Sequence, residues 1–230
     1  MKISIILAVL FSNALAQNNA SSPNGCNDGL SPGRDEVIFT VPYTYAQVMS
    51  IIGDYKNITW SGSPYDTVTL NGTDNTVGTA RTYDIDGAHV VETITTYSKP
   101  ENGPYEEIHT LGLLTIPSLN LIVFGDYDGT TVTPTCNGAA SIFNFTIDFC
   151  ASNATLAAAT LHTIHLTDAM TVGVFLGGQN FTTCAALANG TATSNTSMPS
   201  VVPASSATCN IVSMSTLISL IGGLSAWLIL

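Results

Sequence analysis

The segment from Asn153 to Leu176 limits the fold more than any other part of the chain. It is rich in alanine, contains no proline, and is long enough to be a helix rather than a strand. Asn153, or Ser152 before it, can cap its first turn. An imperfect apolar stripe that includes one acidic residue marks its inner side: Leu161, Ile164, Asp168, Val172 and Leu176. No other predicted element is long enough to cover the face of a sheet, so this helix must do so.

The residues before this helix predict an antiparallel sheet. The first strand, Arg34 to Val41, is followed by a helix over Tyr45 to Ile52 and a short helical turn over Tyr55 to Thr59. Asp86-Gly87 between two strands is a strong hairpin signal. Six further strands are predicted: 65–70, 78–85, 89–97, 105–114, 119–127 and 140–149. The fold class is therefore α+β, with a seven-stranded sheet wrapped on the long C-terminal helix.

Both ends of the chain carry signals of export and anchoring. Residues 1–16 have a basic start, an apolar run and a small-residue end, which predicts a secretory signal peptide. The tail at 209–230 is apolar to its last residue, and Ser205 lies among small residues suited to lipid attachment. We expect a glycosylphosphatidylinositol anchor at Ser205 and a location at the outer leaflet of the plasma membrane or in the cell wall. A true transmembrane tail remains the alternative.

The predicted domain organisation follows from these signals. Residues 17–33 form an N-terminal extension, 34–186 the folded domain, and 187–208 a stalk rich in Ser and Thr that cannot bury a core. Export also makes glycosylation relevant. Eight asparagines stand in acceptor motifs: Asn19, Asn57, Asn71, Asn144, Asn153, Asn180, Asn189 and Asn195.

Charge and cysteine content narrow the function further. A net charge of −11 with five basic residues argues against nucleic acid and anionic lipid headgroups as partners. Of the five cysteines, Cys209 would leave with the tail, so four remain for two disulfides in an oxidising compartment.

Two stretches resemble the START-related (SRPBCC) superfamily, which includes birch-pollen allergens, abscisic-acid receptors and polyketide cyclase/dehydrase-like proteins. They are TVPYTYAQVMSIIGDYKNITW and VGTARTYDIDGAHVVETITTYS, with Gly53-Asp54, Trp60, Arg81 and Glu92 at the family's positions. The resemblance extends from Glu36 to Gly177 and implies a helix-grip fold with a hydrophobic cavity between sheet and last helix. The chain departs from the family in its cysteines, in the short turn at Asp86-Gly87, and in an unusual turn-like stretch, GDYDGTTVTPTCNGA.

The resemblance also implies a disulfide pairing. In a helix-grip sheet the last strand pairs with the first, which brings Cys150 near Cys26. The closing helix then runs back and brings Cys184 near Cys136. The hairpin pairing Cys136–Cys150 is the alternative.

The same resemblance places seven residues at a ligand. Glu92 would point into the cavity, and Arg81, Tyr83 or His109 would help to orient the polar end of the ligand. The aromatic walls would be Phe143, Phe145 and Phe149. The structural alternatives are a buried Arg81–Glu92 ion pair and ordinary core packing of the aromatics.

Metal and catalytic sites are not predicted, and no cofactor is assigned. His162, His165 and His109 would need to converge with Asp168 to bind a metal. The acidic residues Asp126, Asp128 and Asp148 are too sparse for a known calcium loop.

The sequence therefore predicts a monomeric, secreted and anchored glycoprotein that holds a hydrophobic small molecule or lipid. One alternative is a polyketide cyclase/dehydrase-like enzyme with His109 or Glu92 as acid or base. The other is a structural cell-wall glycoprotein whose cavity is filled by its own side chains.

Overall fold

The computed structural model describes residues 25–27, 29–85 and 87–190. The predicted signal peptide, the acceptor motifs at Asn19 and Asn195, the lipid-attachment residue Ser205 and the 209–230 tail lie outside the described residues. Most of the predicted stalk lies outside them as well.

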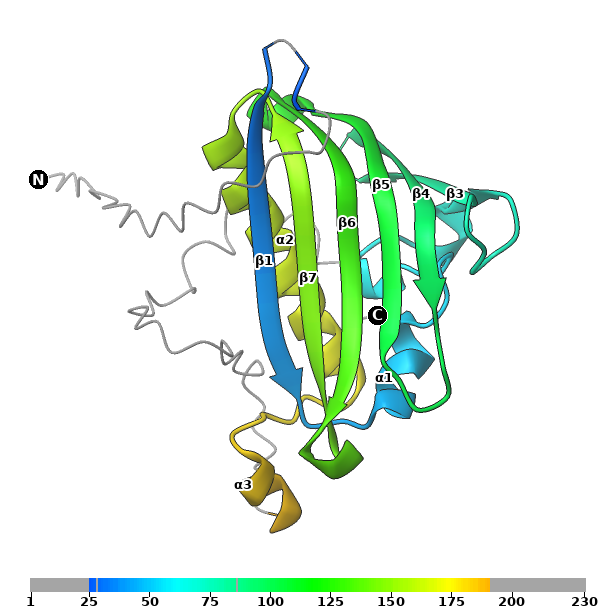
Figure 1. Cartoon of the computed structure of the whole chain (residues 1–230), viewed down its shortest axis with the longest axis vertical. Helices are drawn as coiled ribbons and strands as arrows, with labels where there is room; N and C mark the ends of the chain where they lie inside the picture. Colours follow the sequence, from blue (N-terminus) through cyan, green and yellow to red (C-terminus); the bar gives the residue numbers. More distant parts are fainter. Residues whose placement is uncertain (1–24, 28, 86, 191–230) are drawn as a thin grey trace, which may run out of the picture.

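Seven antiparallel strands form one sheet in the order β1-β7-β6-β5-β4-β3-β2 (Figure 1). From β2 onward, each strand pairs with the next one in the sequence, and β7 also pairs with β1. The predicted seven-stranded antiparallel sheet is confirmed. Its strands are β1 (Ser31–Val41), β2 (Thr69–Asn71), β3 (Ala80–Ile85), β4 (Ala88–Ser98), β5 (Tyr105–Ile116), β6 (Leu121–Thr135) and β7 (Ala140–Ala151).

Three α-helices accompany the sheet in the described part of the chain: α1 (Tyr45–Ile52), α2 (Ala154–Phe175) and α3 (Cys184–Ala188). The long helix α2 lies across one face of the sheet, which we call the inner face (Figure 1). Four 3₁₀ turns complete the described elements: Thr59–Ser61, Tyr65–Thr67, Pro117–Leu119 and Cys136–Gly138. This arrangement is the predicted α+β helix-grip fold. None of the helices described is long and apolar enough to cross a membrane.

Helix α1 begins with a complete capping box. The Thr44 hydroxyl accepts a hydrogen bond from the Gln47 backbone N–H at 3.3 Å, and the Gln47 side chain accepts one from the Thr44 N–H at 2.9 Å. We expect Thr44→Ala to lower the free energy of unfolding by about 1 kcal/mol, because the Gln47 backbone N–H loses its acceptor. Urea denaturation measures the change. Ser50→Ala, at an exposed position of the same helix, should stay within about 0.5 kcal/mol. Equal effects of the two substitutions would contradict the role of the cap.

Three local predictions were wrong. The second short helix lies at Thr59–Ser61 rather than 55–59, because Tyr55 is fully buried and its hydroxyl donates to the Glu92 carbonyl. Pro64 starts a 3₁₀ turn, so the strand expected at 65–70 is reduced to β2. Most of the turn-like stretch after Gly125 is instead part of β6, whose threonines pair with β7 as far as Thr135, and only Cys136–Gly138 forms a turn.

The buried side of α2 differs from the predicted stripe. Ile164 is exposed, whereas the buried residues are Ala157, Leu161, His165, Asp168, Ala169, Val172 and Gly173. The inner side of the helix therefore presents two ionisable side chains, His165 and Asp168, to the sheet.

Apolar residues form two separate clusters on the inner face. One cluster, near the end of β1, contains the stacked rings of Phe39 and Phe143 together with Phe145 and residues of α1. The other contains Leu111, Val123, Phe149 and the first turns of α2. Most of the buried charged groups belong to the strand segments between these clusters.

Two disulfides join distant parts of the chain: Cys26–Cys150 and Cys136–Cys184. This is the connectivity that the family resemblance implies, and the alternative Cys136–Cys150 pair does not form. The first disulfide fixes the residues before β1 to the end of β7, and the second fixes α3 to the β6–β7 connection. The regular structure extends from Ser31 to Ala188, slightly beyond both predicted domain boundaries at 34 and 186.

Candidate functional site

A β-bulge in β6 decides which of its side chains face inward. His109 pairs with Asp128, but Leu111 pairs with Gly125, so β6 holds one extra residue between these two points. The pairing of β6 with β7 shows the same irregularity between Gly125 and Tyr127. Because side chains of a strand alternate between faces, one extra residue reverses the alternation. The bulge therefore places Asp128 on the inner face beside His109.

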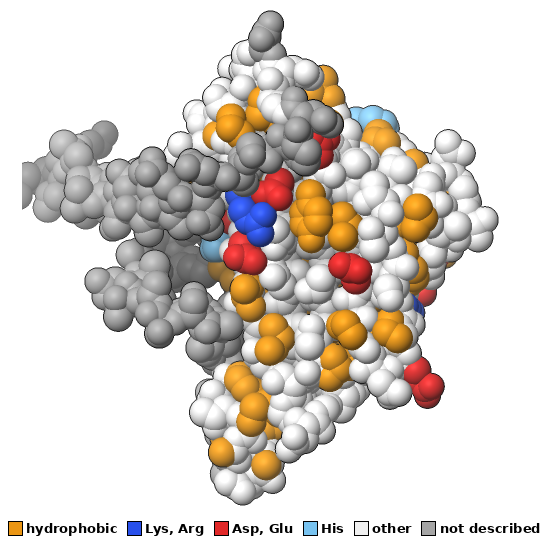
Figure 2. All heavy atoms as spheres, in the orientation of Figure 1, with side chains coloured by type: hydrophobic (Ala, Val, Ile, Leu, Met, Phe, Trp, Pro, Cys, Tyr) orange, Lys and Arg blue, Asp and Glu red, His pale blue; other side chains and the backbone are white. Residues whose placement is uncertain are grey.

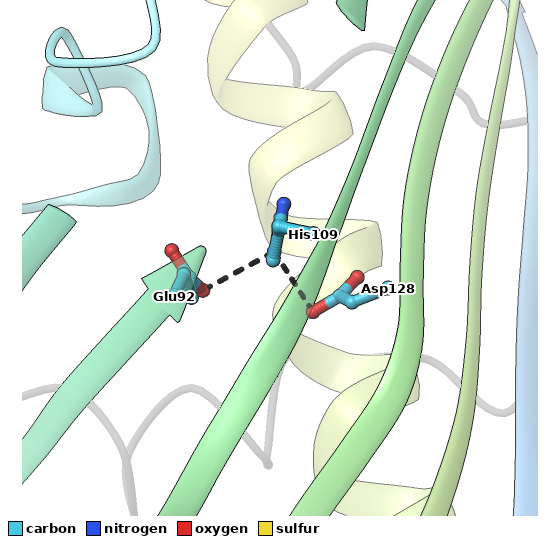
Figure 3. A group of neighbouring side chains, drawn as sticks. All are labelled: Glu92, His109 and Asp128. Atoms are coloured by element: carbon cyan, nitrogen blue, oxygen red, sulfur yellow. Dashed lines mark ion pairs between the residues drawn. The ribbon is translucent and has the colours of Figure 1, made fainter. Parts of the chain in front are cut away.

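His109 lies between two carboxylates at the centre of the inner face (Figure 3). Its Nε2 atom is 3.4 Å from Glu92 Oε1 on β4 and 3.2 Å from Asp128 Oδ2 on β6. The side chains of His109 and Glu92 are 5% and 7% exposed, and that of Asp128 is 16% exposed. Although the atoms are close, neither ring nitrogen of His109 makes a well-aligned hydrogen bond to any described group. This is unusual for a buried polar side chain.

Arg81 supplies the permanent positive charge of the cluster. It pairs through Nε with Glu92 Oε2, directly across the β3–β4 ladder. One of its terminal nitrogens donates to the Tyr55 carbonyl at 2.8 Å and lies 3.8 Å from Glu107 Oε1. The guanidinium also stacks 4.2 Å from the centre of the Tyr55 ring. Arg81 is therefore held by groups from three separate segments.

Two tyrosine hydroxyls orient the glutamates. Tyr83 donates to Glu92 Oε1 at 3.1 Å, and Tyr105 donates to Glu107 Oε2 at 2.6 Å. Glu107 Oε1 lies 3.6 Å from His109 Nδ1, on the opposite side of the ring from Glu92. His109 is thus surrounded by three carboxylates whose positions are fixed by neighbouring side chains or by strand pairing.

The charges of the cluster shift each other's pKa values. Burial alone would raise the pKa of Glu92, but Arg81 and His109 outweigh it and hold this pKa well below its usual range. Burial alone would lower the pKa of His109, but Glu92 and Asp128 outweigh it and raise this pKa well above its usual range. The carboxylates around His109 therefore favour its protonated form.

Helix α2 adds further ionisable groups from the other side. The carboxyl of Asp168 accepts a hydrogen bond from the Ser61 hydroxyl at 3.1 Å, and burial raises its pKa to about 7. His162 and His165 both bind Asp35 of β1, at 2.9 and 3.0 Å. The helical histidines are thus paired with Asp35, and the convergence with His109 that a metal site on α2 would need does not occur.

The seven residues predicted at the ligand divide into two groups. Arg81, Tyr83, Glu92 and His109 come together in the buried cluster described above. The three phenylalanines are fully buried in the apolar clusters, Phe143 and Phe145 at one end and Phe149 at the other. A surface pocket of about 290 Å³ lies elsewhere, between α1 and the β4–β5 turn, and contains none of the seven.

Sequence reasoning missed Asp128 and Glu107 as members of the site. Glu107 could have been found, because it is two residues before His109 on β5 and so shares its face. Asp128 required knowledge of the bulge. In the structure, the bulge appears as a shift from buried Val123 and Gly125 to buried Thr130 and Val132. This shift reverses the alternation within one strand.

The fold and the cluster together define a helix-grip α+β protein with a charged centre on the inner face of its sheet. No family model matches the chain, and no curated protein matches it. Solved structures match it at low identity. A protein from Nitrosospira multiformis is 14% identical with a TM-score of 0.48, over 62% of this chain and 95% of that chain.

Two further structures show similar values. A protein from Bacillus thuringiensis is 12% identical with a TM-score of 0.46, over 63% of this chain and 98% of its own. Norcoclaurine synthase from Thalictrum flavum, solved with dopamine and hydroxybenzaldehyde, is 8% identical with a TM-score of 0.46, over 76% of this chain and 96% of its own. All three TM-scores are below 0.5, so the matches do not assign the chain to a superfamily. They carry no argument about function, which must come from the site.

Proposed function

We propose that this protein binds a small molecule between the sheet and α2, and that the molecule has an apolar body and a cationic or hydrogen-bond-donating end. The observation that supports this most is the position of the charged cluster between two apolar clusters on one face. An amphiphilic ligand would match both kinds of surface at once.

The balance of charge favours a donor or a cation over an anion. Within the cluster, Glu92, Glu107 and Asp128 face Arg81 and His109, and Asp168 approaches from α2. Carboxylates therefore outnumber the cationic side chains. By contrast, charged side chains are few and scattered on the outer face of the sheet (Figure 2). Burying charge costs stability, and clusters of such groups with shifted pKa values are common at functional sites.

The test is uptake of small molecules by the full chain, expressed in a secreting host. We expect native mass spectrometry to detect a co-purified small molecule or uptake of an amphiphilic amine probe. Glu92→Gln should weaken binding of the amine by about 10-fold or more, because a hydrogen bond to a charged group contributes about 1.5–3 kcal/mol. An apolar probe without a polar end should bind the unmodified protein and the Glu92→Gln variant equally.

The matched control is Glu106→Gln, on the opposite face of β5. This substitution removes the same charge outside the cluster and should leave amine binding unchanged. A protein that is folded by circular dichroism, emerges empty and takes up no probe would contradict the proposed function. Equal effects of the two glutamine variants would exclude Glu92 from the site.

The proposed location is the cell surface, and the proposed ligand belongs to the broad class of hydrophobic small molecules or lipids. Support comes from the sequence signals at 1–16 and 209–230 and from the two disulfides, which are compatible with an oxidising compartment.

A second candidate function, acid–base catalysis on the bound molecule, is favoured by Asp168. Its pKa of about 7 allows this carboxyl to gain and release a proton near neutral pH. His109, with its raised pKa, is a second proton donor in the same interior. If a co-purified molecule is turned over, Asp168→Asn should abolish turnover while retaining binding.

A further inference from the structure

The spacing of three side-chain atoms on the inner face matches a metal coordination sphere. His109 Nε2 lies 3.4 Å from Glu92 Oε1 and 3.2 Å from Asp128 Oδ2, and all three atoms lie within 4.8 Å of one another. Zinc binds nitrogen and oxygen ligands at about 2.0–2.2 Å, so tetrahedral ligands lie about 3.3 Å apart. The two distances from His109, drawn as dashed lines in Figure 3, are therefore close to those between ligands of one zinc ion.

The second ring nitrogen of His109 has a carboxylate nearby, as that of a metal-bound histidine usually has. When one ring nitrogen binds a metal, the other usually donates to a carboxylate, which fixes the tautomer. Glu107 Oε1 lies 3.6 Å from His109 Nδ1, and Tyr105 holds the other oxygen of Glu107 at 2.6 Å. With a proton on Nδ1, Nε2 would direct its lone pair between Glu92 and Asp128.

Glu92 also retains free coordination capacity. Arg81 pairs with Glu92 Oε2, so Oε1 meets only the Tyr83 hydroxyl and the His109 ring. A carboxylate oxygen can accept a hydrogen bond and bind a metal at the same time. Both nitrogens of the buried His109 lack a well-aligned hydrogen bond, which a bound ion would correct at Nε2.

We infer that Glu92, His109 and Asp128 bind a divalent first-row transition-metal ion, with Glu107 and Tyr105 as positioning residues. One imidazole and two carboxylates suit zinc or manganese better than calcium, which prefers six to eight oxygens. Three protein ligands leave a position open for a donor atom of a bound molecule. This inference goes beyond the proposed function and does not rest on it.

The experiment uses the full chain from a secreting host. Metal content is measured by inductively coupled plasma mass spectrometry, and the chelator-treated protein is titrated with Zn²⁺ by calorimetry and with Co²⁺ by visible absorption. We expect one ion per chain and a Co²⁺ spectrum typical of low coordination number. His109→Ala and Asp128→Asn should each lower Zn²⁺ affinity by at least about 10-fold, and Glu107→Gln by about 10- to 100-fold.

Two histidines outside the cluster serve as controls. His89 pairs with Asp84 on the surface at 2.7 Å, and His162 pairs with Asp35 at 2.9 Å. His89→Ala and His162→Ala should leave Zn²⁺ affinity unchanged. If either one removes binding, the ion occupies a different site and the inference is wrong.

A chain that is folded by circular dichroism and binds none of Zn²⁺, Co²⁺ and Mn²⁺ would also overturn the inference. A folding defect in His109→Ala would also lower affinity, so Asp128→Asn is the second test of the site. Asparagine has the same shape as aspartate, and the Asp128 side chain is partly exposed, so this variant should fold. If the protein takes up a small molecule but binds no metal, the metal site is wrong and the proposed function stands. Metal binding without uptake would support it and contradict the proposed function.

Discussion

Arg81→Met should lower the free energy of unfolding by about 3–5 kcal/mol, because it leaves Glu92 and Glu107 buried without their permanent cation. The substitution keeps an apolar side chain of similar length, so most of the loss is electrostatic. The hydrogen bond to the Tyr55 carbonyl and the stacking on its ring are lost as well. Guanidinium denaturation near neutral pH, where both glutamates are ionised, measures the change.

Arg34→Met is the matched control. Arg34 contacts Asp148 through two hydrogen bonds of 3.0 and 3.1 Å, yet these side chains are 31% and 24% exposed. An ion pair of this exposure contributes about 0–1 kcal/mol. The double variant Arg81→Met/Glu92→Gln should recover part of the loss, since it removes one uncompensated charge. A loss below about 1 kcal/mol in Arg81→Met would show that water, or a protonated glutamate, replaces the arginine.

Asp168→Asn should stabilise the protein at alkaline pH by up to about 4 kcal/mol. The pKa of Asp168 is raised by burial from 3.8 to about 7. The unfolded chain therefore releases this proton more easily than the folded protein, and ionisation reduces stability as pH rises from about 4 to 7. Each unit of pKa difference corresponds to about 1.4 kcal/mol. Asparagine cannot ionise, so the gain should be complete above pH 7 and vanish near pH 4.

Asp35→Asn tests the sign of this argument with the same change elsewhere in the interior. For Asp35, burial is outweighed by His162 and His165, which lower its pKa. Its ionised form therefore stabilises the fold above the unfolded-state pKa, and Asp35→Asn should destabilise at neutral pH and lose its effect in acid. Urea denaturation from about pH 2 to about pH 9 compares both variants, since the effect of Asp35→Asn is lost only below the ordinary pKa of 3.8. Destabilisation by Asp168→Asn at pH 8 would contradict the raised pKa.

The sequence predicted the architecture because its strongest signals are local and periodic. The alternation in β7 places Phe143, Phe145 and Phe149 on one face, and the structure buries all three there. The capping residue and the absence of proline located α2 to within two residues at each end. Such patterns depend on neighbours along the chain, so a single sequence contains them.

The site was only partly predictable, because its geometry depends on contacts between strands. Arg81 and Glu92 can be placed together from the hairpin at Asp86-Gly87, since the register follows from the turn. The pairing of His109 with Asp128 follows instead from an extra residue in β6. The inner face of α2 was misassigned for a related reason: Ile164 is the better apolar residue, but packing against β1 turns His165 inward to Asp35.

The bulge in β6 has a consequence for comparing this chain with its relatives. A strand that lacked one residue there would pair regularly, because Gly125 and Asp128 would then stand two positions apart, and Asp128 would still face inward. A strand of unchanged length that paired without the bulge would instead turn Asp128 to the outside and leave His109 with fewer acidic neighbours. Loss of the charged centre can thus occur through a change of register, without any change of side chain. In an alignment of relatives, an aspartate at position 128 is therefore not enough to show that the centre is shared, and a one-residue gap near Asp126 does not show that it is lost.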